Sequence, residues 1–122
     1  MEECDVQEEM KKDLEKQTKQ FSLAIIKFTA SLPRNREADI LARQLLRSGT
    51  SIGANYREAN RGVSRADFAN KMGTVQKEAS ETQYWLELFT ESEILKTPPS
   101  RLHAEASELL AIFTAIGKKL KS

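Results

Sequence analysis

Four runs of apolar residues, each repeating every three or four positions, constrain this chain more than any other feature. That spacing is typical of one face of an α-helix. The four stripes are Leu14, Thr18, Phe21, Ile25, Phe28 and Leu32; Ala38, Leu41, Leu45, Ser48, Ile52, Asn55 and Ala59; Phe68, Met72, Val75, Ala79, Thr82, Leu86 and Phe89; and Leu102, Ala106, Leu109, Phe113, Ile116 and Leu120. Only short breaks near Pro33, Gly62 and Lys96 separate them. Short connections force successive helices to run antiparallel.

Capping residues help to place the helix ends. Asn35 is an expected N-cap, Ser64 opens a Ser-x-x-Asp capping box with Asp67, and Pro98 fits the first position of the last helix. We therefore predict helices over about residues 5–31, 36–61, 65–92 and 98–120. A chain of 122 residues amounts to one domain. The prediction is an all-α protein, an antiparallel up-down-up-down four-helix bundle spanning residues 1–122.

Three of the predicted helices carry a second apolar face. Leu23, Ile26 and Ala30 lie off the first stripe, and the next two helices add Leu46, Gly49, Gly53, Tyr84, Trp85 and Leu88. An apolar patch left outside a single bundle usually marks a protein contact, so we expect a homo-oligomer whose interface includes those last six residues. Two alternatives stay open. The glycines can admit a helix of the same bundle, and the larger side chains can wrap the edges of a wide core.

The formal net charge is only +1, but it is unevenly distributed. Residues 34–77 carry nine basic and four acidic side chains, whereas each flanking segment carries five basic and seven acidic ones. Six arginines follow the side of the second predicted helix opposite its stripe and the turn after it: Arg36, Arg43, Arg47, Arg57, Arg61 and Arg65. Arginine suits bidentate phosphate contacts, so this row is a candidate site for RNA or DNA. Solvated or ion-paired arginines, with Glu37, Asp39 or Glu58 as partners, are the alternative.

The chemistry of an enzyme is missing from the sequence. His103 is the single histidine and has no Cys or His at ligand spacing, and Cys4 sits in a charged segment without a nucleophile's surroundings. Glu78 and Glu81 are three residues apart, but Glu81 lies well round from the stripe, which favours a solvated or salt-bridged role. We therefore predict no enzymatic activity, no catalytic residues, no metal and no cofactor.

Polar residues interrupt the apolar stripes at Ser48, Asn55 and Thr82. Buried polar groups need hydrogen-bond partners and can fix the register of helices, which is the structural interpretation of these positions. A small binding site formed by Asn55 and Glu58 is the other interpretation.

The opening segment and the cysteine content indicate the compartment. The chain begins with a polar stretch that lacks the basic start and apolar core of a signal peptide, and its lone cysteine cannot form an internal disulfide. No apolar run approaches the roughly 20 residues that cross a bilayer. We expect a cytoplasmic protein with no membrane partner.

Two stretches carry a resemblance to a known family. They are LPRNREADILARQLLRSGTSIGANYREANRGVSRADF, which starts at Leu32, and KEASETQYWLEL, which starts at Lys77. With the surrounding helices, about residues 20–120, the chain resembles the bacterial four-helix bundle proteins encoded in intervening sequences of 23S rRNA genes. A more distant resemblance is to the accessory variability proteins of diversity-generating retroelements, which are strongly basic and associate with nucleic acid and a reverse transcriptase.

The resemblance implies an all-helical protein that assembles as a ring of five bundles and has no assigned activity. Many relatives read Asn-Ile-Ala-Glu-Gly where this chain has Asn55, Tyr56, Arg57, Glu58 and Ala59, and the near-neutral charge departs from the basic retroelement branch. The function expected from sequence is a non-enzymatic pentameric scaffold, associated with RNA or DNA through the arginines. The alternative is a protein–protein interaction adaptor that binds an unidentified protein and no nucleic acid.

Overall fold

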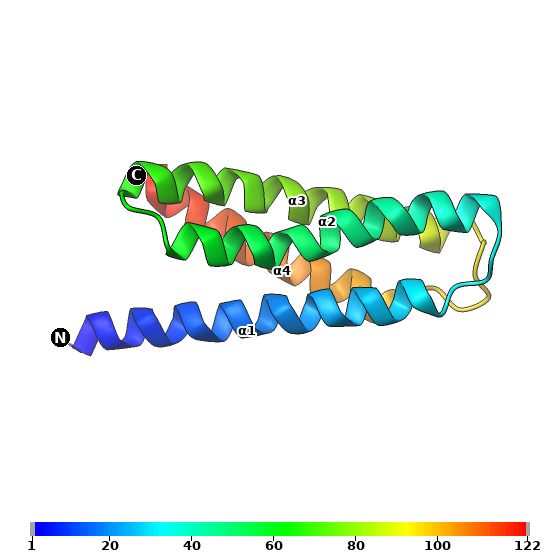
Figure 1. The fold of residues 1–122 in the computed structure, drawn as a ribbon, viewed down its shortest axis with the longest axis horizontal. Coiled ribbons are helices and arrows are strands. Elements are labelled where there is room, and N and C mark those ends of the chain that lie inside the picture. The colour runs from blue at the N-terminus through cyan, green and yellow to red at the C-terminus, as the bar shows by residue number, and fades with distance from the viewer. Residues whose placement is uncertain (1, 122) are drawn as a thin grey trace.

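Four antiparallel helices in chain order form the bundle (Figure 1). The computed structural model describes residues 2–121, with side chains from Glu8 onward. The helices are α1 (Glu2–Ala30), α2 (Arg36–Asn60), α3 (Arg65–Glu91) and α4 (Ser100–Lys121). Each packs on the next along the chain. The backbones of α1 and α3 stay apart at opposite corners of the bundle, and these helices meet across the core through the edge-on rings of Phe28 and Phe89, whose centroids are 5.5 Å apart. The predicted all-α up-down architecture is confirmed.

The core is built from the predicted stripes. Every stripe residue is buried or half-buried, and the largest fully buried side chains include Phe89, Phe113 and Ile25. One stripe position differs from the prediction. Tyr56, only 3% exposed, packs its ring 5.2 Å from that of Phe113, while the neighbouring Asn55 is half-buried and donates to the Ser51 carbonyl oxygen.

Side-chain caps begin two of the helices where the sequence places them. The Asn35 side chain accepts a hydrogen bond from the Ala38 amide at 2.8 Å, and the Ser64 hydroxyl accepts one from the Asp67 amide at 3.1 Å. These bonds satisfy amides that the first turn of a helix leaves without partners.

The start of α4 corrects the sequence prediction. The helix begins at Ser100, two residues after Pro98, which was expected at its first helical position. The carbonyl oxygens of Pro98 and Pro99 instead accept from the amides of Ser100 and His103. Pro99 disfavours the helical conformation of Pro98, the residue before it, so the helix begins after both prolines. Pro99 is itself buried.

Two glycines of α2 let α1 approach closely. A Cβ on Gly49 would stand 3.0 Å from the Ile25 side chain, and one on Gly53 would stand 3.2 Å from the Thr18 hydroxyl. Gly49 is buried and Gly53 is half-buried. The helix that these glycines admit is therefore α1 of the same chain, which answers a question that the sequence left open.

The seam between α1 and α4 is the weakest of the four. These helices have far fewer contacts with each other than α1 has with α2 or α3 has with α4. Figure 1 shows α1 running along the edge of the bundle, with its N-terminal end reaching past the α2–α3 connection. The bundle is therefore open along one side.

Candidate interaction surfaces

Arg47 of α2 is held by two carboxylates of α3. Its guanidinium donates to both oxygens of Glu78, at 3.4 and 3.2 Å, and to Glu81. The Glu78 side chain is only 11% exposed, so the Arg47 guanidinium replaces much of the water that would otherwise solvate it. The indole N–H of Trp85 also points to Glu81, at 3.4 Å. Arg47, predicted to face nucleic acid, instead ties α2 to α3.

A buried polar contact lies beside this ion pair. The Thr82 hydroxyl is 2.9 Å from that of Ser48 and 2.7 Å from the Glu78 carbonyl oxygen, to which it donates. Both hydroxyl side chains are completely buried. The structural interpretation of Ser48 and Thr82 is confirmed, whereas Asn55 bonds within its own helix and takes no part.

The other arginines of the predicted row do not form one patch. Arg57 pairs with Glu15 of α1 at 3.8 Å, and Arg36 approaches the neighbouring Glu37 at 3.5 Å on the surface. Within the described chain, no ion pair is present for the exposed residues Arg43, Arg61 and Arg65. Arg36 and Arg61 stand at opposite ends of α2. The unpaired cations are thus divided between the middle of α2 and the α2–α3 turn.

A polar network between α1 and α2 reaches the buried Tyr56. The Asn60 amide donates to the Glu15 carboxylate at 2.9 Å, and the Asn60 side chain also bonds Tyr56. Burial raises the pKa of the Tyr56 phenol above 10.0; the nearby Glu15 charge adds to this rise, and the Asn60 hydrogen bond opposes it. The network joins the middle of α1 to the end of α2.

One exposed apolar surface lies across α1 and α2. Leu23, Ile26 and Leu46 are 56%, 47% and 38% exposed, and Ile26 and Leu46 border a shallow depression with Ala42 and Arg43. We call Leu23, Ile26, Ala42 and Leu46 the α1–α2 face. Asp39 and Arg43 are the charged residues that line the depression beside this apolar face.

A second exposed apolar surface lies on α3. Tyr84 is 52% exposed, and its ring meets that of Trp85 edge-on at 5.3 Å. Trp85 and Leu88 are only half-buried, and Trp85 also packs against the core, so the edge-wrapping alternative accounts for part of the predicted outer face. We call Tyr84 and the exposed parts of Trp85 and Leu88 the α3 face. It lies on the helix diagonally opposite α1.

Comparison with known proteins decides the family. The family model for the 23S rRNA-intervening sequence protein matches residues 10–120. The chain belongs to this family. A crystal structure of a Bacteroides thetaiotaomicron protein of unknown function, from the S23 ribosomal protein family, matches with a TM-score of 0.80 and 35% identity over 88% of this chain and 97% of that one. No curated protein matches the chain.

This member of the 23S rRNA-intervening sequence protein family keeps His103 at the rim of the bundle. Its Nε2 lies 3.8 Å from a Glu87 oxygen, without a hydrogen bond. Between Glu8 and Lys121, no three His, Cys, Asp or Glu side chains gather closely enough to hold a metal ion. No helix among the described residues is sufficiently long and apolar to cross a membrane. Cys4 lies outside the described side chains.

Sequence reasoning missed two features of this family member. The salt-bridged role expected for Glu78 is the one that the structure shows, but its burial was missed, although its position only four residues before the buried Thr82 places it on the same face. Sequence reasoning also missed the open α1–α4 seam, because the stripes show which face each helix buries and not how tightly two helices approach.

Proposed function

We propose that this protein is a non-catalytic scaffold that assembles with copies of itself into a closed ring, of five subunits as the family resemblance implies. The carrying observation is that two exposed apolar surfaces, the α1–α2 face and the α3 face, lie on different sides of the bundle. When the contacting surfaces differ, copies join head to tail, and such a contact closes into a ring or continues as a filament.

Charge supports the pairing of these two faces. Arg43 stands unpaired beside Ile26 and Leu46, and Glu91 is exposed two helical turns from Tyr84 on α3. Opposite charges at the rim of an apolar contact favour one register and one partner orientation. In the proposed ring, the α1–α2 face of one copy covers the α3 face of the next.

Light scattering of the purified chain tests the assembly. The expected mass at micromolar concentration is that of five subunits, and Ile26→Glu should lower it because a charge in the apolar contact must be desolvated. Ala111→Glu, on an exposed position of α4, is the matched control and should leave the mass unchanged. A native chain that stays monomeric at that concentration rejects the scaffold.

A second candidate function is binding of RNA or DNA, and one observation favours it. Arg61 and Arg65 flank the α2–α3 turn, exposed and without ion-pair partners in the described chain, so a ring would repeat this basic turn once per subunit. Binding of a labelled duplex should weaken with salt and fall in the double variant Arg61→Glu with Arg65→Glu, but not in Lys77→Glu. Without such binding at low salt, a protein–protein adaptor remains the interpretation.

A further inference from the structure

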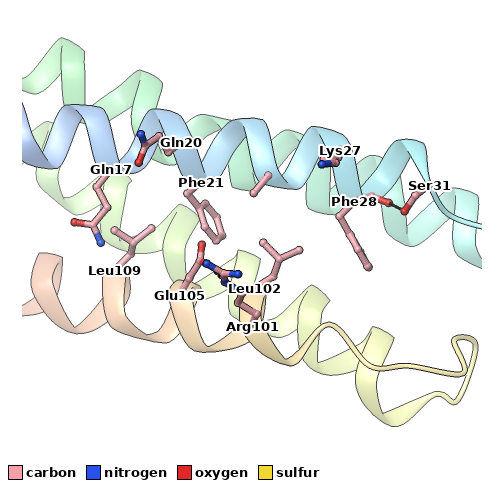
Figure 2. Close-up of a pocket in the computed structure, with 11 residues that line it drawn as sticks. Gln17, Gln20, Phe21, Lys27, Phe28, Ser31, Arg101, Leu102, Glu105 and Leu109 are labelled. Carbon is pink, nitrogen blue, oxygen red and sulfur yellow. Dashed lines mark hydrogen bonds and ion pairs between the residues drawn. The ribbon is translucent and has the colours of Figure 1, made fainter.

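A cleft of about 610 Å³ runs between α1 and α4, along the open side of the bundle. Its α1 wall extends from Gln17 to Ser31 and its α4 wall from Arg101 to Leu109. Figure 2 shows Phe21 and Phe28 reaching from α1 toward α4, with Arg101 and Glu105 close together on the facing wall. The cleft lies on a different side of the bundle from both faces proposed for self-assembly.

The shape of the cleft follows from the sequence of α1. Phe21 and Phe28 stand two turns apart, and the small Ala24 between them leaves the middle of the seam unfilled. From Gln17 to Phe28 the α1 wall is roughly 16 Å long, parallel to the helix axes. Leu102 and Leu109 complete an apolar floor. An elongated apolar floor between two helices matches the way an amphipathic helix lies in a groove.

The charges on the rim define the occupant further. Lys27 and Arg101 are the two cations of the lining and Glu105 is its one acid, already paired with Arg101 at 3.4 Å. Lys27 has no ion-pair partner among the described residues. Gln17 and Gln20 add neutral hydrogen-bonding groups. The rim therefore favours acidic side chains and leaves no second anion to repel them.

We propose that the α1–α4 cleft binds an amphipathic helix of another protein, with an apolar stripe on the floor and acidic residues facing Lys27. The partner helix fills the space above Ala24 and packs against the half-buried Phe28 and Leu102. This gives the scaffold one docking position per subunit, separate from its self-assembly contacts.

The test uses a fluorescently labelled peptide of about 16 residues with leucines at helical spacing and glutamates at the edges of the stripe. It is titrated with the full chain and followed by fluorescence anisotropy. Saturable binding is expected, with little binding by a scrambled peptide of the same composition. Equal binding of the two peptides overturns the proposal.

Two variants locate the peptide. Ala24→Leu fills the middle of the cleft and should weaken binding about tenfold or more, whereas Ala111→Leu on the exposed side of α4 should not. Lys27→Glu should weaken the glutamate peptide and favour a lysine version of it, with Lys77→Glu as the charge control. The charge reversal keeps the proposal falsifiable if Ala24→Leu does not fold.

The remaining outcomes identify another occupant. If Ala24→Leu lowers the mass of the native assembly, the cleft is a contact between copies of this chain and the partner helix is rejected. If dodecyl phosphate binds the cleft and the peptide does not, the occupant is an anionic amphiphile, which also overturns the proposal. If Ala24→Leu keeps the mass of the native assembly and loses peptide binding, the result supports the partner helix.

Discussion

The glycines of this bundle have different surroundings, although the sequence presents them alike. Gly49 is packed against Ile25, whereas a Cβ on Gly73 would meet no other atom within 4 Å. A glycine inside a helix costs about 1 kcal/mol relative to alanine, and of these two glycines only Gly49 has a packing reason in the described chain.

Alanine substitutions at these positions should have opposite effects. Gly73→Ala should stabilise the chain by about 1 kcal/mol through helix propensity. Gly49→Ala should destabilise it by roughly 1 kcal/mol, because the cost of pushing Ile25 away exceeds the same gain. Urea unfolding at one fixed protein concentration measures both. A loss of stability at Gly73 would show that another surface approaches α3 there.

Tyr56 gives the chain a specific response to high pH. The pKa of Tyr56 is raised in the folded state, so the unfolded chain loses its phenolic proton at a lower pH than the folded chain does. The contribution of the neutral Tyr56 to the free energy of unfolding is therefore fully present below pH 10.0. It should be lost as the pH rises through the higher folded pKa. From pH 9 upward, the free energy of unfolding should fall less steeply with pH in Tyr56→Phe than in the native chain. Parallel curves would contradict the assignment.

The choice between Asn55 and Tyr56 shows where prediction from a stripe fails. Continuing from Ile52, a step of three reaches Asn55 and a step of four reaches Tyr56, and both steps keep helical spacing. The structure buries the tyrosine, whose ring contributes far more apolar area. Spacing alone could not separate the two, whereas side-chain size could have done so.

At the scale of elements, the ion pair between Arg47 and Glu78 joins α2 and α3. Arg47→Ala would leave the Glu78 carboxylate, only 11% exposed, without its cation and should cost roughly 2 kcal/mol of unfolding free energy. Replacing both residues by Met should recover much of this loss, because no buried charge remains.

The control for this prediction is Arg43→Ala, which removes an arginine with no ion pair in the described chain and should change stability by less than about 0.5 kcal/mol. Chemical unfolding of these three variants and the native chain measures how much stability depends on the Arg47–Glu78 pair. Equal effects of Arg43→Ala and Arg47→Ala would mean that the seam does not depend on the pair.

The elements themselves were largely predictable, and the exceptions have local causes. The four helices and the caps at Asn35 and Ser64 follow from spacing and from unpaired amides in the first turn. The start of α4 was wrong because Pro98 is followed by a second proline, which restricts the residue before it. The partner of Arg47 could not be predicted from the sequence, because 31 positions separate it from Glu78.

At the scale of the whole molecule, the open α1–α4 seam is what the sequence could not show. Helices adjacent in the chain are brought together by short connections, but α1 and α4 meet only as the outcome of three successive packings. The size of single side chains, such as Ala24 between Phe21 and Phe28, then decides whether the two helices pack closely along the seam. The cleft therefore belongs to the tertiary structure, whereas the outer apolar residues of α1, α2 and α3 were predictable from their spacing.

The assembly proposed for these faces needs two unlike surfaces on every copy. Ile26→Glu disables the α1–α2 face and leaves the α3 face intact, while Tyr84→Glu does the reverse. Each variant alone is expected to be monomeric, because no ring closes when one face of every subunit is lost.

Mixing the two variants and measuring the mass by light scattering is therefore the most direct test. The intact α3 face of Ile26→Glu can still join the intact α1–α2 face of Tyr84→Glu, and the resulting pair has no free working face. The account predicts a one-to-one complex with the mass of two subunits. A mixture that remains monomeric, or a variant that forms dimers by itself, would contradict head-to-tail assembly.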